Sequence, residues 1–151
     1  MPPTIFLDID GVLTTPASGW RIVPALLDRA LHIADATEAV FVISSSWREE
    51  TLEKTVSFLP PVLAKRIAGQ TPDLGTDRKG VEVKAWLAEH PTENWCVIDD
   101  EAWPFLPEQM WNFVPVDTRT GLTEENVERA IEILRNSMPT SPVSNKEYVN
   151  K

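Results

Sequence analysis

The sequence predicts an α/β domain in which one open, parallel sheet has helices on both faces. Short apolar runs alternate along the chain with segments whose apolar residues recur at helical spacing, which is typical of this class. Polar residues also follow each clear apolar run directly. In a parallel sheet the carboxyl ends of all strands lie along one edge, so we expect these polar residues to meet there.

The length of 151 residues suits one domain and is too short for two. We assign residues 1–136 to this domain. Residues 137–151 contain two prolines, are mostly polar and show no periodicity, so we predict a flexible C-terminal tail there.

Apolar runs rich in strand-forming residues predict the strands. The three buried strands are predicted at Thr4–Ile9, Ala39–Ile43 and Asn94–Ile98. Two weaker segments predict edge strands, Arg66–Gln70 and Asn112–Val116. The second belongs at an edge because Pro115 has no backbone N–H for a neighbouring strand.

Helical spacing of apolar residues predicts four helices. They are expected over residues 23–34, from Trp47 to 59, over 80–90 and over 124–135. Ser46 and Glu49 form the pattern of a capping box for the second helix, and Thr123 is the expected cap of the last.

The charge balance narrows the range of partners. Fourteen Lys and Arg stand against 23 Asp and Glu, a net charge of −9, which works against binding along a nucleic-acid backbone or an anionic membrane. Contact with a single phosphate remains compatible with it. The only cysteine, Cys96, excludes an internal disulfide. With neither a long apolar run nor a signal-peptide pattern at Met1, we expect a cytoplasmic protein with no membrane association.

Two carboxylates open the predicted catalytic edge. Asp8 and Asp10 stand two residues apart at the end of the first strand, so their side chains can point the same way. Gly11 then allows the backbone to turn sharply. On this segment alone, a loop with an N-capping aspartate is an equally good interpretation.

Three further features fall at the same edge. Ser44 ends the second strand with a hydroxyl that can contact a phosphoryl oxygen. Lys79 stands at a helix start, where the helix dipole disfavours a cation that has no anionic partner. Asp99 and Asp100 follow the third strand and repel each other unless a hard divalent cation relieves them. A turn serine, a solvated lysine and a turn pair of aspartates are the structural alternatives.

These features, in this order, resemble the haloacid dehalogenase (HAD) superfamily of aspartyl-phosphate phosphatases. The segments with this likeness are Phe6–Leu13 (FLDIDGVL), Val40–Ser44 (VFVIS), Lys79 and Cys96–Asp100 (CVIDD). The likeness extends over nearly all of the predicted domain. Val12 is a departure, because many members have threonine at this position.

A narrower resemblance is to a capless subgroup of this superfamily. It includes the phosphatase-like domain of multidomain RNA-repair proteins, and polynucleotide kinase-phosphatases are distant relatives. The matching segments are Ser44–Arg48, Thr71-Pro72, Lys79-Gly80 with Trp86-Leu87, and Gly121-Leu122-Thr123. The resemblance implies a Rossmann-like, HAD-like fold. The segments between Asp10 and Ser44 and between Ser44 and Lys79 are too short for a cap domain, so we expect an open site.

The resemblance also implies a mechanism. Asp8 is the expected nucleophile, which forms an aspartyl-phosphate, and Asp10 the expected general acid and base. Ser44 and Lys79 would hold the transferring oxygens. The implied ligands of Mg²⁺ are Asp8, the backbone carbonyl of Asp10, and at least one of Asp99 and Asp100. The implied activity is Mg²⁺-dependent hydrolysis of phosphomonoesters, with a phosphorylated substrate such as a nucleic-acid 3′-phosphate or 2′,3′-phosphate end, or a phosphoprotein.

Arginines and tryptophans near this edge are candidates for substrate contact. Arg48 and Arg78 are the expected phosphate-binding residues, with Arg21 as a third candidate, and surface arginines are the alternative. Three tryptophans are placed to stack on a base: Trp20, Trp47 and Trp103. The other three are expected in the core: Trp86, Trp95 and Trp111.

The remaining reactive side chains are expected to be structural, namely His32, His90 and Cys96. Two other functions on the same scaffold are disfavoured. A dehalogenase has no use for the acidic pair, and a phosphomutase needs a cap. A non-catalytic module that binds phosphorylated ends, as part of a repair assembly, is the alternative from another class.

Overall fold

The computed structural model describes residues 2–135, 142 and 143. Its strands are β1 (Thr4–Leu7), β2 (Val40–Ile43), β3 (Ile67–Gln70), β4 (Trp95–Asp99) and β5 (Phe113–Pro115). Its helices are α1 (Pro24–Thr37), α2 (Leu52–Ser57), α3 (Pro61–Ala64), α4 (Lys79–Glu89) and α5 (Glu124–Leu134), with a 3₁₀ helix η1 at Pro107–Asn112.

The five strands form one parallel sheet in the order β3-β2-β1-β4-β5. From β1 the chain builds outward to β3, and it then crosses to the other side of β1 to form β4 and β5. The direction of building therefore reverses beside β1, and open α/β sheets bind ligands at the carboxyl ends of their strands at such a reversal. The predicted α/β class, the parallel sheet and both edge strands are confirmed.

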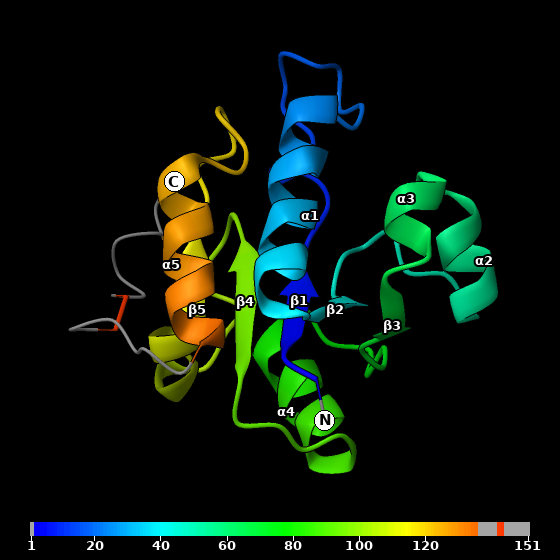
Figure 1. Cartoon of the computed structure of the whole chain (residues 1–151). Coiled ribbons are helices and arrows are strands. Elements are labelled where there is room, and N and C mark those ends of the chain that lie inside the picture. The colour runs from blue at the N-terminus through cyan, green and yellow to red at the C-terminus, as the bar shows by residue number, and fades with distance from the viewer. Residues whose placement is uncertain (1, 136–141, 144–151) are drawn as a thin grey trace.

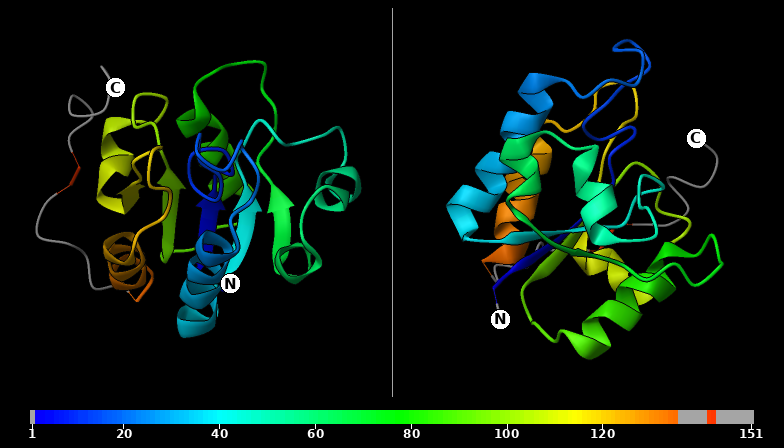
Figure 2. Two further views of the ribbon diagram at one scale, coloured as in Figure 1. Left: turned by 90° about the horizontal axis from the view of Figure 1, so that it is seen from above. Right: turned by 90° about the vertical axis from the view of Figure 1, so that its right-hand side faces the viewer.

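Alternate side chains of the strands pack into two cores, one on each face of the sheet. Leu7, Ile43 and Ile98 belong to the larger core, which also contains apolar residues of α1 and α5. Phe6 and Val97 belong to the smaller core, together with residues of α4 and η1. Figure 1 and the two views of Figure 2 show α1 and α5 side by side on one face, and α4 on the other. Both faces are covered, as the sequence predicts.

The segment after β2 differs from its prediction. The helix expected to begin at Trp47 begins at Leu52 instead. The backbone N–H of Trp47 donates to Ser45 Oγ over 3.1 Å, and a turn therefore forms where the first helical turn was predicted. Thr51 caps the helix through its side chain, so the prediction that Ser46 begins a capping box was wrong.

The other predicted elements are found with bounds that shift by a few residues. Two short helices, α3 and η1, were not predicted. Both begin at a proline whose ring is compatible with the first helical position, and both are too short to show a periodic pattern.

The described connections near the carboxyl edge of the sheet contain no additional domain. Between β1 and β2 the chain forms one loop and α1, and between β2 and α4 it forms α2, α3 and β3. Within the described residues no cap domain is present, as predicted. None of the helices that the structure describes could cross a lipid bilayer.

Most of the predicted tail, residues 137–151, lies outside the described residues. Val143 is an exception. Its backbone N–H donates to the carbonyl of Met110 over 3.2 Å, and its side chain packs against the smaller core.

Candidate active site

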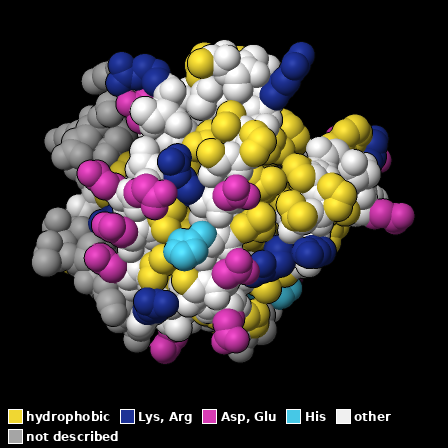
Figure 3. Space-filling model, turned by 45° about the horizontal axis from the view of Figure 1, so that its top comes forward, with side chains coloured by type: hydrophobic (Ala, Val, Ile, Leu, Met, Phe, Trp, Pro, Cys, Tyr) yellow, Lys and Arg dark blue, Asp and Glu magenta, His cyan; other side chains and the backbone are white. Residues whose placement is uncertain are grey.

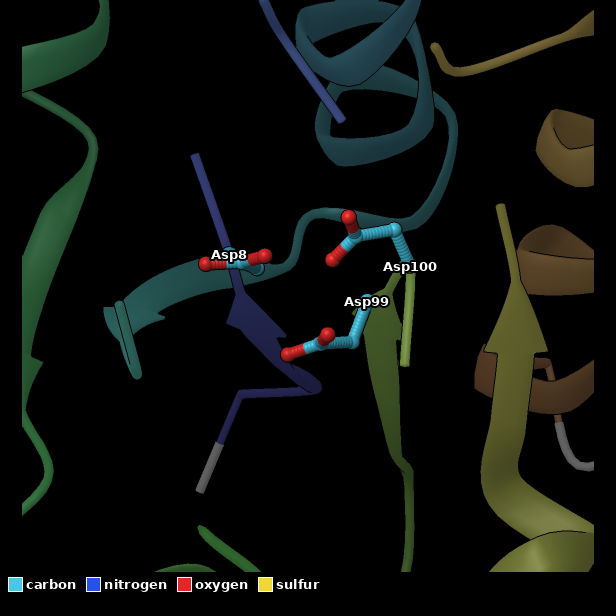
Figure 4. Close-up of side chains that lie close together, drawn as sticks. All are labelled: Asp8, Asp99 and Asp100. Atoms are coloured by element: carbon cyan, nitrogen blue, oxygen red, sulfur yellow. The ribbon is translucent and has the colours of Figure 1, made fainter. Parts of the chain in front are cut away.

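Three carboxylates converge at the carboxyl edge of the sheet. Asp8 directly follows β1, Asp99 is the last residue of β4, and Asp100 comes next. Figure 4 shows the side chains of Asp99 and Asp100 pointing toward Asp8 across the space between the two strands. One carboxylate oxygen of each residue lies within 4.8 Å of the others. The structure thus brings together three of the predicted metal ligands.

Lys79 is the cation of this cluster. Its Nζ lies 2.8 Å from Asp99 Oδ2 and 3.4 Å from Asp8 Oδ1. Gly80 explains why the lysine reaches this position. A Cβ at Gly80 would overlap the backbone of Phe105 and Leu106, so glycine allows the start of α4 to pack against that loop. The predicted anionic partner of Lys79 is therefore found.

Burial dominates the electrostatics of the two inner carboxylates. It raises the pKa of Asp8 well above its ordinary value, with a further contribution from Asp99 and opposition from Lys79. Burial also raises the pKa of Asp99, to about 7, although Lys79 opposes it. For Lys79, burial alone would lower the pKa, but the two carboxylates outweigh it and the pKa is raised. Burial thus favours the protonated forms of Asp8 and Asp99.

Asp100 is held against the turn that follows β1. Thr118 donates its hydroxyl to Asp100 Oδ2 over 2.7 Å. Gly11 has a φ of +84°, and a Cβ there would overlap the carboxylate of Asp100. Glycine at this position thus serves both the turn and the close approach of a metal-ligand candidate. No pattern in the sequence predicts the role of Thr118.

The carboxylate of Asp99 is already engaged on both oxygens. Oδ2 accepts from Lys79, and Oδ1 accepts from the backbone N–H of Glu101 over 3.0 Å. Asp99 is therefore placed to hold Lys79 beside Asp8, whereas Asp100 lies at the outer side of the cluster.

Asp10 lies apart from the three clustered carboxylates and is half-buried. Its Oδ1 accepts from the hydroxyl of Thr14 and its Oδ2 from the indole N–H of Trp47, each over 3.0 Å. No motif in the sequence predicts either donor, since neither has a fixed spacing from Asp10 that is specific to this contact.

Ser44 is buried at the end of β2, directly beside β1 in the sheet. Its backbone N–H donates to the carbonyl of Leu7 over 3.0 Å. Its hydroxyl oxygen has no hydrogen-bond partner. Among the described residues, every other buried side-chain nitrogen or oxygen has one. A buried hydroxyl without a partner costs about 1–3 kcal/mol, so the Ser44 hydroxyl is free to hydrogen-bond a bound molecule.

Arg48 makes contacts within the protein. Its guanidinium bonds the carbonyls of Ser45, Thr71 and Pro72 over 2.9–3.2 Å and lies 3.1 Å from Oε1 of the buried Glu82. These contacts fix the turn after β2 to the segment after β3. Its expected role in substrate binding remains a prediction, and no pattern in the sequence predicts its pairing with Glu82.

Arg78 and Arg21 are exposed, and no side-chain hydrogen bond or ion pair is found for either among the described residues. Arg78 directly precedes Lys79, so it lies near the cluster. Its expected contact with a substrate phosphate also remains a prediction.

The division of the tryptophans into exposed and core residues differs in part from the prediction. Trp20 and Trp103 are exposed, as expected of residues at the edge. Trp111 is 39 % exposed, so its expected core position was wrong, because η1 turns this side chain outward. Trp86 and Trp95 pack against the smaller core.

A cleft of about 740 Å³ lies beside the turn after β2. Its lining residues are Ser46, Arg48, Glu49, Glu50, Gln70, Thr71, Pro72 and Asp73. Figure 3 shows apolar side chains and single charged groups mixed over the face that it presents, with no continuous basic surface there. Such a face does not favour binding along a nucleic-acid backbone.

A capless parallel sheet with clustered aspartates at its central strands defines a domain of the HAD type. The chain belongs to the family described as the HAD domain in Swiss Army Knife RNA repair proteins, whose profile matches residues 4–127. The match spans Asp8, Lys79 and the Asp99-Asp100 pair. A search of curated proteins and a search of solved structures each found no match. The resemblance to a HAD-superfamily, RNA-repair-like domain is thus confirmed.

The donor set fits a magnesium ion. Three carboxylates with oxygens this close repel one another, and burial raises the pKa of two of them, Asp8 and Asp99. Hard oxygen ligands of this kind are those that Mg²⁺ prefers. The residues that would hold the ion are Asp8, Asp99 or Asp100, and the backbone carbonyl of Asp10.

Proposed function

We propose that this protein is a Mg²⁺-dependent phosphomonoester hydrolase that acts through an aspartyl-phosphate on Asp8. One observation supports this proposal above the others. The buried Asp8 lies beside Lys79 and the acidic pair, and Ser44, whose buried hydroxyl has no partner, directly follows the neighbouring strand β2. A nucleophile, a cation and a free hydroxyl are the groups that phosphoryl transfer needs.

In the first step, a carboxylate oxygen of Asp8 forms a bond to phosphorus while the bond from phosphorus to the leaving oxygen breaks. Asp10 transfers its proton to that leaving oxygen. In the second step, Asp10 takes a proton from a water molecule, whose oxygen bonds to phosphorus as the bond to Asp8 breaks. Inorganic phosphate leaves and both aspartates are restored.

Lys79 and Ser44 would contact the non-bridging phosphoryl oxygens in both steps. Lys79 also offsets the charge that builds beside Asp8, which matters because two unit charges 4 Å apart interact by about 4 kcal/mol at an effective dielectric of 20. A bound Mg²⁺ would supply further positive charge to the phosphoryl oxygens and to Asp8.

For the substrate we propose a phosphorylated end of a nucleic acid, either a 3′-phosphate or the monoester that remains once a 2′,3′-cyclic phosphate has been opened. The family description supports this class because it names RNA repair proteins. The open edge admits a large substrate, and the net charge of −9 suits contact with the terminus rather than with a long stretch of backbone. A cytoplasmic location is part of the same proposal, supported by the single, buried Cys96.

Phosphate release tests the proposal. The substrates are p-nitrophenyl phosphate, oligonucleotides with 3′-phosphate, 2′,3′-cyclic phosphate and 5′-phosphate ends, and a phosphopeptide. Each is assayed with Mg²⁺ and with chelator, for the wild type and for Asp8→Asn. We expect release that needs Mg²⁺ and is lost in Asp8→Asn.

A folded wild type that binds a phosphorylated end but releases no phosphate would overturn the enzymatic proposal. The non-catalytic binding module would then be the better account. Release from the phosphopeptide alone would retain the chemistry and replace the substrate class.

A further inference from the structure

Asp10 receives hydrogen bonds from two donors that come from different parts of the chain. We propose that Trp47 is a positioning residue, whose indole N–H fixes the orientation of the Asp10 carboxyl group for proton transfer to the leaving oxygen. This inference rests on the proposed function, in which Asp10 is the general acid.

The two donors take one oxygen each. The indole N–H of Trp47 donates to Oδ2 and the hydroxyl of Thr14 to Oδ1, both over 3.0 Å. Thr14 is itself fixed, since its hydroxyl accepts the backbone N–H of Gly11 over 3.2 Å. A carboxyl group with a donor on each oxygen can neither rotate about its terminal bond nor swing away from its place. The plane of Asp10 is thus set from both sides.

Trp47 is rigid enough to act as a positioning group. Its indole packs against the larger core, and its backbone N–H donates to Ser45 Oγ over 3.1 Å. The next residue, Arg48, bonds Ser45, Thr71 and the buried Glu82. The turn that presents the indole is therefore held from three directions, and reactive groups are positioned best by side chains that packing has already fixed.

This geometry predicts a specific kinetic defect. A misplaced general acid slows reactions in which the leaving oxygen needs a proton and spares those in which it leaves readily as an anion. The decrease in kcat on removal of the indole N–H should therefore depend on the leaving group of the substrate. If the role of Trp47 were purely structural, its substitution would lower kcat by the same factor for all substrates.

The test measures kcat and KM with two monoesters, p-nitrophenyl phosphate as the good leaving group and glycerol 2-phosphate as the poor one. Trp47→Phe keeps an aromatic ring and removes the N–H. We expect kcat for glycerol 2-phosphate to fall by about 10- to 100-fold, and kcat for p-nitrophenyl phosphate by less than about threefold. Trp111→Phe, at the opposite end of the sheet, is the matched control and should change neither.

A second variant distinguishes the loss of the hydrogen bond from a defect in folding. Site-specific replacement of Trp47 by β-(3-benzothienyl)alanine keeps the size and shape of the side chain and removes only the N–H donor. It should reproduce the same dependence on the leaving group, with thermal stability close to that of the wild type. Thr14→Val, which removes the other donor, should show a defect of the same kind.

Equal losses on both substrates, or no loss in the benzothienyl variant, would overturn the role of Trp47 while leaving the proposed function intact. If the Asp8→Asn variant turns substrate over as fast as the wild type, the proposed function is instead overturned. The two failures are therefore distinguishable in one set of assays.

Discussion

The ends of β4 and β2 lie on either side of Asp8, the proposed nucleophile, yet a cation has a different role at each. Beside β4, Lys79 pairs with Asp99 and Asp8 in the acidic cluster. Beside β2, Arg48 pairs with the buried Glu82 and bonds three backbone carbonyls. Each cation lies against a buried carboxylate, but only the first carboxylate belongs to the cluster that could hold a metal ion.

The difference shows that a cation near the carboxyl edge of the sheet can serve either a proposed chemical role or the architecture. Lys79 is a point charge beside the carboxylates that we propose to react or to hold a metal ion. Arg48 uses several donors at once to fasten the turn that includes Trp47 to the segment after β3. A lysine could not make this set of contacts, because its three donors share one nitrogen.

The largest expected effect comes from Lys79→Met. Removing the cation beside Asp8 should lower kcat by about 10²- to 10³-fold, because a charge on the transferring oxygens is lost. Steady-state kinetics at saturating Mg²⁺, with circular dichroism to verify folding, make the measurement. A loss below tenfold would place Lys79 outside the chemistry.

Arg48→Met is the matched substitution at the other strand end. It leaves the carboxylate of Glu82 buried without its partner, which should lower the free energy of unfolding by about 2–4 kcal/mol. Urea denaturation measures this change. The variant could instead keep its stability and show a larger decrease in kcat than Lys79→Met. In that case Arg48 binds the substrate phosphate, and the contrast between a catalytic Lys79 and a structural Arg48 is wrong.

Thr118→Val sharpens the account of the acidic pair. It removes the hydroxyl that orients Asp100, so we expect Mg²⁺ to bind about tenfold more weakly. Isothermal titration with Mg²⁺ gives the affinity, and Thr120→Val, whose hydroxyl bonds only nearby backbone carbonyls, is the control. Unchanged affinity would show that Asp100 needs no such support.

A smaller effect is expected from pH. Folding raises the pKa of Asp8 and Asp99, so in the metal-free protein they hold protons at pH values where the unfolded chain has lost them. The stability from these protons is fully present below about pH 4 and is lost as pH rises through about 7.

Magnesium takes the place of these protons, so it should raise the melting temperature more at pH 8 than at pH 5.5. The difference in stabilisation should be on the order of 1 kcal/mol. Thermal melts at the two pH values, with Mg²⁺ and with chelator, measure it. A stabilisation that is equal at both values would contradict the proposed link between the cluster and the metal.

Periodicity and strand-end position were enough to predict the sheet and the meeting of Asp8 with Asp99, Asp100 and Lys79. Both depend on rules that act along the chain: strands alternate with helices, and the carboxyl ends of parallel strands share an edge. The order of the motifs along the chain also predicted the HAD superfamily, which the profile match confirms.

Contacts made by single side chains between distant segments could not be predicted. The turn at Ser45 replaced the predicted start of a helix, because a side chain competed locally with the backbone. The bond from Trp47 to Asp10 and the pair of Arg48 with Glu82 each join segments that are far apart in sequence. No periodic pattern encodes such pairs, so the structure was needed to find them.

Trapping of the covalent intermediate tests the central claim most directly. The wild type is mixed with substrate and Mg²⁺, quenched, treated with borohydride, which reduces an acyl phosphate to an alcohol, and digested for mass spectrometry. The account predicts homoserine at position 8, found only when substrate and Mg²⁺ are both present. Phosphate release with an unmodified Asp8, or with a modification at another carboxylate, would contradict it.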